Sequence, residues 1–206
     1  MGRLLGILLL LAALGGAAWL FRDRIPGPWS RGEAQEATGV SPATAEAAEA
    51  KLQRLRDDGE EVALSGAEVT SLLRYRLQGG LAGRVHDPVV TFEGDGVRVT
   101  GRVPTEELPD VRELRAVREF LPDTADVSVQ GKLRTLDDGR TAVKVDAVSF
   151  ARVPVPQEVY ARALERFGRQ DEPGLAPDEY AVRLPPGVGA ARVEGGRLVL
   201  SPAARP

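Results

Sequence analysis

The chain has 206 residues and carries 27 lysines and arginines against 30 aspartates and glutamates, a net charge of −3. Proteins that bind nucleic acids usually present a basic surface, so this charge argues against nucleic acid as a partner. The sequence has no cysteine, which excludes disulfides, thiolate catalysis and cysteine-ligated metals. Aromatic residues are only 5% of the chain, so a core must consist mainly of Val, Leu and Ala.

An uninterrupted apolar run, LLGILLLLAALGGAAWLF, occupies Leu4–Phe21. As a helix its 18 residues span roughly 27 Å, enough to cross a thin bilayer. Trp19 and Phe21 lie where an interfacial aromatic belt belongs. We therefore predict a transmembrane anchor over residues 1–25. A core helix is disfavoured, because an all-apolar helix at this end of the chain has nothing to bury it.

A cleaved signal peptide is the alternative for the same segment. Arg3 would supply its charged n-region, Leu4–Leu14 its apolar h-region and Gly16-Ala17-Ala18 its cleavage site. The apolar run continues past that site, which favours the uncleaved anchor. The count of positive charges on the two sides does not favour export, but long domains translocate largely regardless of charge. We expect a single-pass protein of the cell membrane with its C-terminal domain outside the cytoplasm.

Residues 26–44 are rich in Pro, Gly, Ser and Ala and are predicted to be a linker, with the extracytoplasmic domain over residues 45–203. Ser41-Pro42 offers an N-cap followed by proline at the first helical position, so we expect a helix to about Asp57 that Gly59 terminates. Its apolar positions follow a 3-4-3 spacing, at Ala45, Ala48, Leu52 and Leu55. This narrow stripe predicts docking onto the domain, because two heptads of mostly alanine do not support a coiled coil.

A short strand is expected at Glu61–Leu64, followed by a helix that opens on a capping box. In that box the Ser65 hydroxyl accepts from the Glu68 amide while the Glu68 carboxylate accepts from the Ser65 amide. Gly79-Gly80 is predicted to end the helix. Its apolar face is expected to contain Val69, Leu72, Leu73 and Leu77.

The first of two predicted β-hairpins has Val90 and Phe92 alternating with polar residues before a turn at Glu93–Gly96. The Asp95-Gly96 pair in that turn favours positive φ. The alternation continues to Val103, so one face of the hairpin is expected to be buried and the other wet. Apolar residues at helical spacing then predict a helix over Pro109–Leu121.

The second hairpin alternates from Val127 to Leu133, turns at 137–140 and returns through Val143 and Val145. At Ala147-Val148 the apolar phase slips by one residue, which predicts a β-bulge. A final pair of strands is expected around Tyr180–Leu184 and Ala191–Leu200, the latter turning at Glu194–Arg197.

The clearest amphipathic pattern follows Val153-Pro154-Val155-Pro156, which leads into a helix with Pro156 near its first turn. We name its broad apolar face the apolar stripe; it consists of Val159, Tyr160, Ala163, Leu164 and Phe167. These five residues are the candidate lining of an apolar ligand groove. The alternative is that they are ordinary core residues.

No catalytic or metal-binding motif is present: GxxxxGK[ST], GxSxG, HExxH and the EF-hand loop are all absent. His86 lacks a nucleophile or a second orienting group for a triad. The acidic pairs Asp57-Asp58, Glu60-Glu61 and Asp137-Asp138 are candidates for binding a divalent cation or for acid–base work, but two of them lie beside glycines at helix ends or turns, where Asp is expected for backbone reasons. Arg74-Tyr75-Arg76 offers two guanidiniums for phosphate, although a solvated helix face is the favoured interpretation. We therefore predict a protein that is not an enzyme and has no catalytic residue, metal or cofactor.

Hairpins mixed with helices, without βαβ alternation, predict an α+β fold with an antiparallel sheet packed on amphipathic helices, after an N-terminal transmembrane helix. Leu64–Leu73, the paired strands around Asp95-Gly96 and the Val153–Pro156 entry to the stripe helix form a familiar order. Over roughly residues 60–200 the chain resembles membrane-anchored bacterial envelope proteins of uncharacterised function with a tubular lipid-binding (TULIP)-like domain. The resemblance implies a curved sheet that wraps a long helix and leaves an apolar groove for acyl chains.

Two functions are compatible with these features. The first is a membrane-anchored extracytoplasmic domain that binds lipid or another apolar envelope ligand without catalysis. The alternative is an envelope scaffold that binds a protein partner, in which case the apolar stripe is plain core. The expected partners are the membrane through Leu4–Phe21, a lipid and an envelope protein, and nucleic acid is not expected.

Overall fold

The computed structural model describes residues 39–76, 85–104, 123–136, 141–150, 153–158, 160–161, 174–182 and 184–203. The elements in chain order are α3 (Pro42–Asp58), β1 (Val62–Leu64), α4 (Gly66–Tyr75), β2 (His86–Glu93), β3 (Gly96–Pro104), β4 (Thr124–Thr135), β5 (Thr141–Phe150), β6 (Val153–Pro154), β7 (Glu179–Val182), β8 (Val188–Glu194) and β9 (Arg197–Pro202). The predicted α+β class is confirmed.

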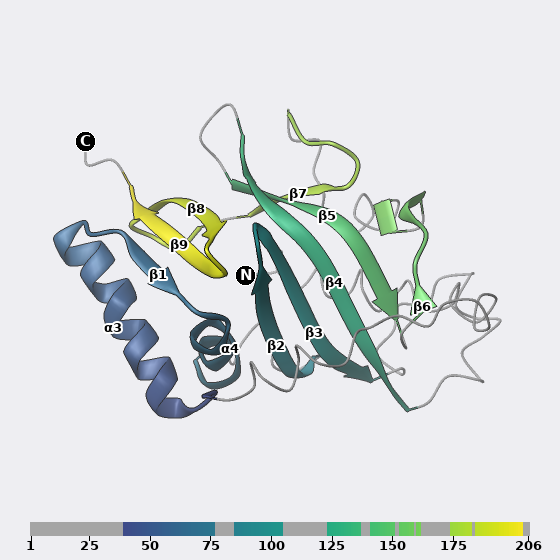
Figure 1. Cartoon of the computed structure of the whole chain (residues 1–206), viewed down its shortest axis with the longest axis horizontal. Coiled ribbons are helices and arrows are strands. Elements are labelled where there is room, and N and C mark those ends of the chain that lie inside the picture. Colours follow the sequence, from purple (N-terminus) through teal and green to yellow (C-terminus); the bar gives the residue numbers. More distant parts are fainter. Residues whose placement is uncertain are drawn as a thin grey trace.

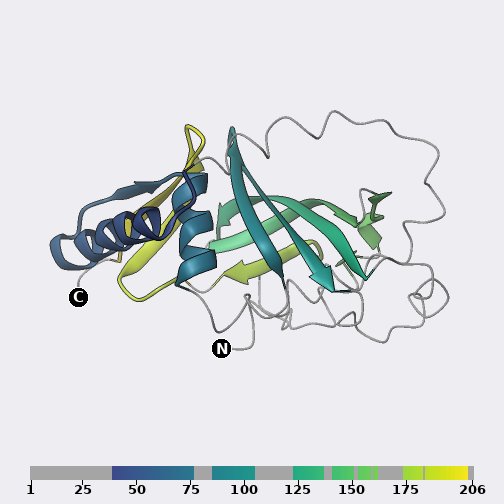
Figure 2. The same ribbon diagram turned by 90° about the horizontal axis from the view of Figure 1, so that it is seen from below.

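A large antiparallel sheet has the strand order β2-β3-β4-β5-β6, and β7 also pairs with β5. It is curved, and the small sheet and the two helices lie together to one side of it (Figures 1 and 2). Along β4, Ala125, Val127 and Val129 are buried while Asp126 and Lys132 are exposed. This division into a buried face and a wet face holds for β4. The first hairpin, for which it was predicted, departs from it in β3, where residues 96–101 are all half-buried.

The small sheet, in the order β1-β9-β8, joins distant parts of the chain. Its main contact with the helices is a core of buried side chains: Ala48, Leu55, Val62, Leu64, Ala191 and Leu200. Leu133 of β4 packs against the same core, so the two sheets share it. The predicted stripe of α3 is confirmed, because Ala45 and Ala48 are 0% exposed and Leu55 is 1% exposed.

Both ends of α3 and the start of α4 follow the local chemistry of the sequence. The Ser41 hydroxyl accepts from the Thr44 amide at 3.1 Å, and Gly59 ends α3 with a φ of 72°. The capping box is present as predicted, with the Ser65 amide 2.8 Å from the Glu68 carboxylate. Lys51 of α3 forms an ion pair with Glu68 at 2.7 Å, which ties the two helices together.

The prediction for the rest of α4 was partly wrong. The helix ends at Tyr75, with Arg76 as its C-cap, so it does not extend to the predicted glycine pair. Its fully buried face contains Thr70 and Ser71, because this face meets the edge of a strand as well as apolar side chains. The Thr70 hydroxyl accepts from the Val90 amide at 2.9 Å.

Through this hydrogen bond, α4 covers the outer edge of β2. Beside the Thr70 bond, Arg74 Nε donates to the Pro88 carbonyl at 2.9 Å. An uncovered edge strand exposes backbone groups that can pair with another chain. The hydroxyl and the guanidinium satisfy two of those groups, and α4 thereby fixes the position of the first hairpin.

The first hairpin turns at Glu93–Gly96 as predicted, but the residue with positive φ is not the expected one. Glu93 pairs with Gly96, so the two-residue loop is Gly94-Asp95, and Gly94 has the positive φ, 61°. The prediction of positive φ at the Asp95-Gly96 pair was therefore wrong. A glycine with positive φ at the first loop position is the pattern of a type II′ turn, which suits the twist of a hairpin.

Other predictions concern residues outside the described ranges. These are the Leu4–Phe21 anchor, most of the linker, the Pro109–Leu121 helix and the 137–140 turn. Among the residues that the structure does describe, no helix has the length and apolar character to span a bilayer. The described chain begins at Gly39, and α3 begins within the predicted linker, at Pro42, as the Ser41-Pro42 cap indicated.

Candidate functional site

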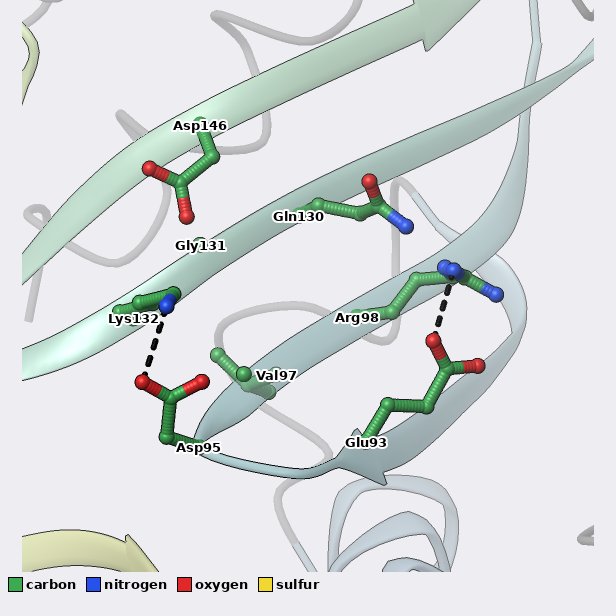
Figure 3. Close-up of a pocket in the computed structure, with 9 residues that line it drawn as sticks. Glu93, Asp95, Val97, Arg98, Gln130, Gly131, Lys132 and Asp146 are labelled. Carbon is green, nitrogen blue, oxygen red and sulfur yellow. Dashed lines mark hydrogen bonds and ion pairs between the residues drawn. The ribbon is translucent and has the colours of Figure 1, made fainter.

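A polar depression lies on the wet face of the large sheet, beside the β2–β3 turn (Figure 3). Its volume is about 170 Å³. It is lined by Glu93, Asp95, Gly96, Val97, Arg98, Gln130, Gly131, Lys132 and Asp146. Four strands and one turn thus contribute to a single surface, and most of its side chains are charged.

Two ion pairs cross the polar depression (Figure 3). Lys132 Nζ lies 2.8 Å from the Asp95 carboxylate, and Arg98 Nη2 lies 3.0 Å from the Glu93 carboxylate. The hydrogen bond from Lys132 lowers the pKa of Asp95, and the same bond raises the pKa of Lys132, with Asp146 adding to the effect. Both cations are therefore paired with carboxylates of the same depression.

Gln130 completes the surroundings of Arg98. The two residues are direct partners across β4 and β3. With the Gln130 amide oxygen turned toward Arg98, the oxygen accepts from the guanidinium, with Arg98 Nε at 2.6 Å. This orientation satisfies both side chains and leaves the guanidinium held between an amide oxygen and a carboxylate.

Asp146 reaches the polar depression through a β-bulge. Gln130 pairs with Ala147 and Gly131 pairs with Val145, so Asp146 is the extra residue of β5. The predicted bulge is confirmed, one residue before the position where the apolar phase slips. Its effect is to place the exposed Asp146 carboxylate over β4 (Figure 3).

Gly131 forms the floor beneath that carboxylate. A Cβ atom at this position would collide with the Lys144 carbonyl oxygen and would touch Val143. The bulge brings the backbone of β5 close to β4 here, so only a glycine fits without displacement. The bulge and the glycine together shape the polar depression.

The outer edge of β5 contacts Tyr160, the first described residue of the apolar stripe. β7 pairs with β5 at one end and β6 pairs with it at the other, which leaves a gap between them. Tyr160 lies at this gap, 3% exposed, and its hydroxyl donates to the Val145 carbonyl at 3.3 Å. The Tyr160 hydroxyl oxygen also lies 3.5 Å from the Asp146 carbonyl oxygen, so Tyr160 contacts the backbone of the bulge. Burial raises the pKa of Tyr160.

Of the five residues proposed to line the apolar groove, the structure describes one, Tyr160. The helix expected after Pro156 is present at residues 157–158 and 160–161. Val159, Ala163, Leu164 and Phe167 lie outside the described ranges. Their assignment to an apolar groove stays a prediction.

The other residues singled out in the sequence lie away from the polar depression. Asp87, next to His86, has a φ of 49° and forms an ion pair with Arg102. Arg74 bonds to β2, and Arg76 forms ion pairs with Glu46 and Glu49 of α3 at 3.4 and 2.9 Å, so both guanidiniums hold elements together. Among the described residues, no group of three His, Cys, Asp or Glu side chains could hold a metal ion.

Sequence reasoning missed the polar depression, because its members come from three separated segments. Arg98, Gln130 and Lys132 looked like ordinary polar positions of alternating strands. The one available signal was the phase slip in β5, which predicted the bulge but not the direction in which Asp146 would point.

Comparison with known proteins adds no relative. No family model, no curated protein and no solved structure matches the chain. The structural class is an α+β domain built on an antiparallel sheet, and any function must be argued from the chain itself.

Proposed function

We propose that this chain is a membrane-anchored domain outside the cytoplasm that binds a lipid or another amphiphilic envelope ligand without catalysing a reaction. The Leu4–Phe21 run supports the membrane anchor, because an 18-residue apolar segment matches the thickness of a bilayer. The candidate site supports binding over catalysis, since the cations of the polar depression are held in ion pairs and no nucleophile–base pair lines it.

One observation carries the choice of an amphiphile. Asp146 is shared between two chemically different regions: its carboxylate lines the polar depression, and its backbone carbonyl lies 3.5 Å from the hydroxyl of Tyr160, a residue of the apolar stripe. A ligand with a polar head and an apolar tail has the same division. The bulge is therefore the point at which a head in the polar depression and a tail along the stripe would meet.

Solvent extraction of the purified full chain tests this proposal. The chain is isolated in a maltoside detergent, extracted, and its lipids are quantified by mass spectrometry, while an apolar dye reports an accessible apolar site. We expect about one lipid per chain and dye binding that added lipid displaces. A chain without co-purifying lipid and without dye binding would contradict the proposal.

An envelope scaffold that binds a protein is the second candidate, and the burial of Tyr160 favours it. A tyrosine that is 3% exposed and bonded to a strand behaves as a core residue, as the scaffold interpretation expects for the whole stripe. Crosslinking in cells separates the two functions. A stoichiometric protein partner in the absence of bound lipid would favour the scaffold.

A further inference from the structure

We draw no further inference here: the strongest candidate, the exposed bulge at Asp87-Pro88 where β2 begins, carries nothing, because the Asp87 carboxylate is already paired with Arg102, the Pro88 carbonyl already accepts from Arg74, and nothing in the described part of the structure points to a ligand or a reaction there.

Discussion

At the scale of single residues, the most buried charged side chain among the described residues is Glu179 in β7. It is 4% exposed, and its two carboxylate oxygens accept from Arg134 at 2.8 and 2.7 Å. One of them also accepts from the Ala176 amide at 2.9 Å. Arg134 further donates to the Gly174 carbonyl at 3.1 Å, so this pair attaches the segment before β7 to β4.

The Glu179 pair predicts a pH dependence of stability. The hydrogen bonds from Arg134 lower the pKa of Glu179 in the folded protein. Its contribution is therefore fully present above the unfolded carboxyl pKa of about 4.3 and is lost as pH falls through the lower folded value. We expect Glu179→Gln to cost about 1–3 kcal/mol at pH 7 and to flatten this part of the acid-unfolding curve.

Urea melts of the full chain between pH 3 and 7 measure this effect. Glu60→Gln, at an exposed carboxylate before β1, is the control and should change the curve little. If Glu179→Gln and the wild type lost stability in parallel as the pH falls, the role given to the Arg134 pair would be wrong.

At the scale of elements, the stability of the large sheet depends on how its two sides are closed, at the outer strand β2 and beside β5, which β6 and β7 cover only in part. The edge of β2 is covered by α4, chiefly through the Thr70 hydroxyl. The gap in the edge of β5 is filled differently: the Val145 amide donates to the Asp178 carbonyl at 2.9 Å and the Val155 amide to the Val148 carbonyl at 2.8 Å. Both edges thus use irregular contacts that sheet pairing alone would not supply.

Substitutions at two buried threonines distinguish the stabilisation that such a hydrogen bond provides from the effect of burial alone. Thr70→Val removes the acceptor of the buried Val90 amide and should cost about 1–3 kcal/mol. Thr91→Val is the matched control, because the Thr91 hydroxyl is buried and has no hydrogen-bond partner among the described residues. It should be neutral or stabilising. Thermal melts of both variants decide the matter, and an equal loss in the two would contradict the covering role of α4.

The apolar stripe provides a second test at this scale. If Leu164 lines a ligand groove, as the proposed function requires, Leu164→Ala should change the stability of the lipid-free chain by less than about 1 kcal/mol and should reduce lipid retention. Leu55→Ala, in the fully buried core beneath α3, should cost about 2–5 kcal/mol. A loss of similar size for Leu164→Ala, seen as a drop of several degrees in melting temperature, would place Leu164 in the core.

At the scale of the whole molecule, the described domain is closed by contacts between its two ends. Arg192 of β8 donates to both oxygens of the Glu61 carboxylate at 2.9 Å, next to the β1–β9 pairing. Ser201 of β9 donates to the same carboxylate at 2.8 Å. The segment that follows the predicted anchor is therefore tied to the C-terminal hairpin.

The helices and hairpins could be predicted from the sequence because the interactions that begin and end them lie between residues close together in the chain. The Ser65–Glu68 capping box, the helix end at Gly59 and the alternating hairpins depend on residues a few positions apart. The pairing of β1 with β9 joins segments more than a hundred residues apart, and nothing in either strand identifies its partner. The polar depression was missed for the same reason. The positive φ of the first hairpin turn was assigned to Asp95-Gly96 instead of Gly94, because both glycines satisfy the turn preference.

The central claim is that the chain is an uncleaved, membrane-anchored protein that carries a lipid. Native mass spectrometry of the full chain, released from maltoside micelles after purification from bacterial membranes, tests both parts in one spectrum. We predict a chain of 22.0 kDa with a bound mass in the range of one phospholipid, which collisional activation removes. A chain shortened by the length of the N-terminal apolar segment, or an intact chain that never carries a lipid, would contradict the account.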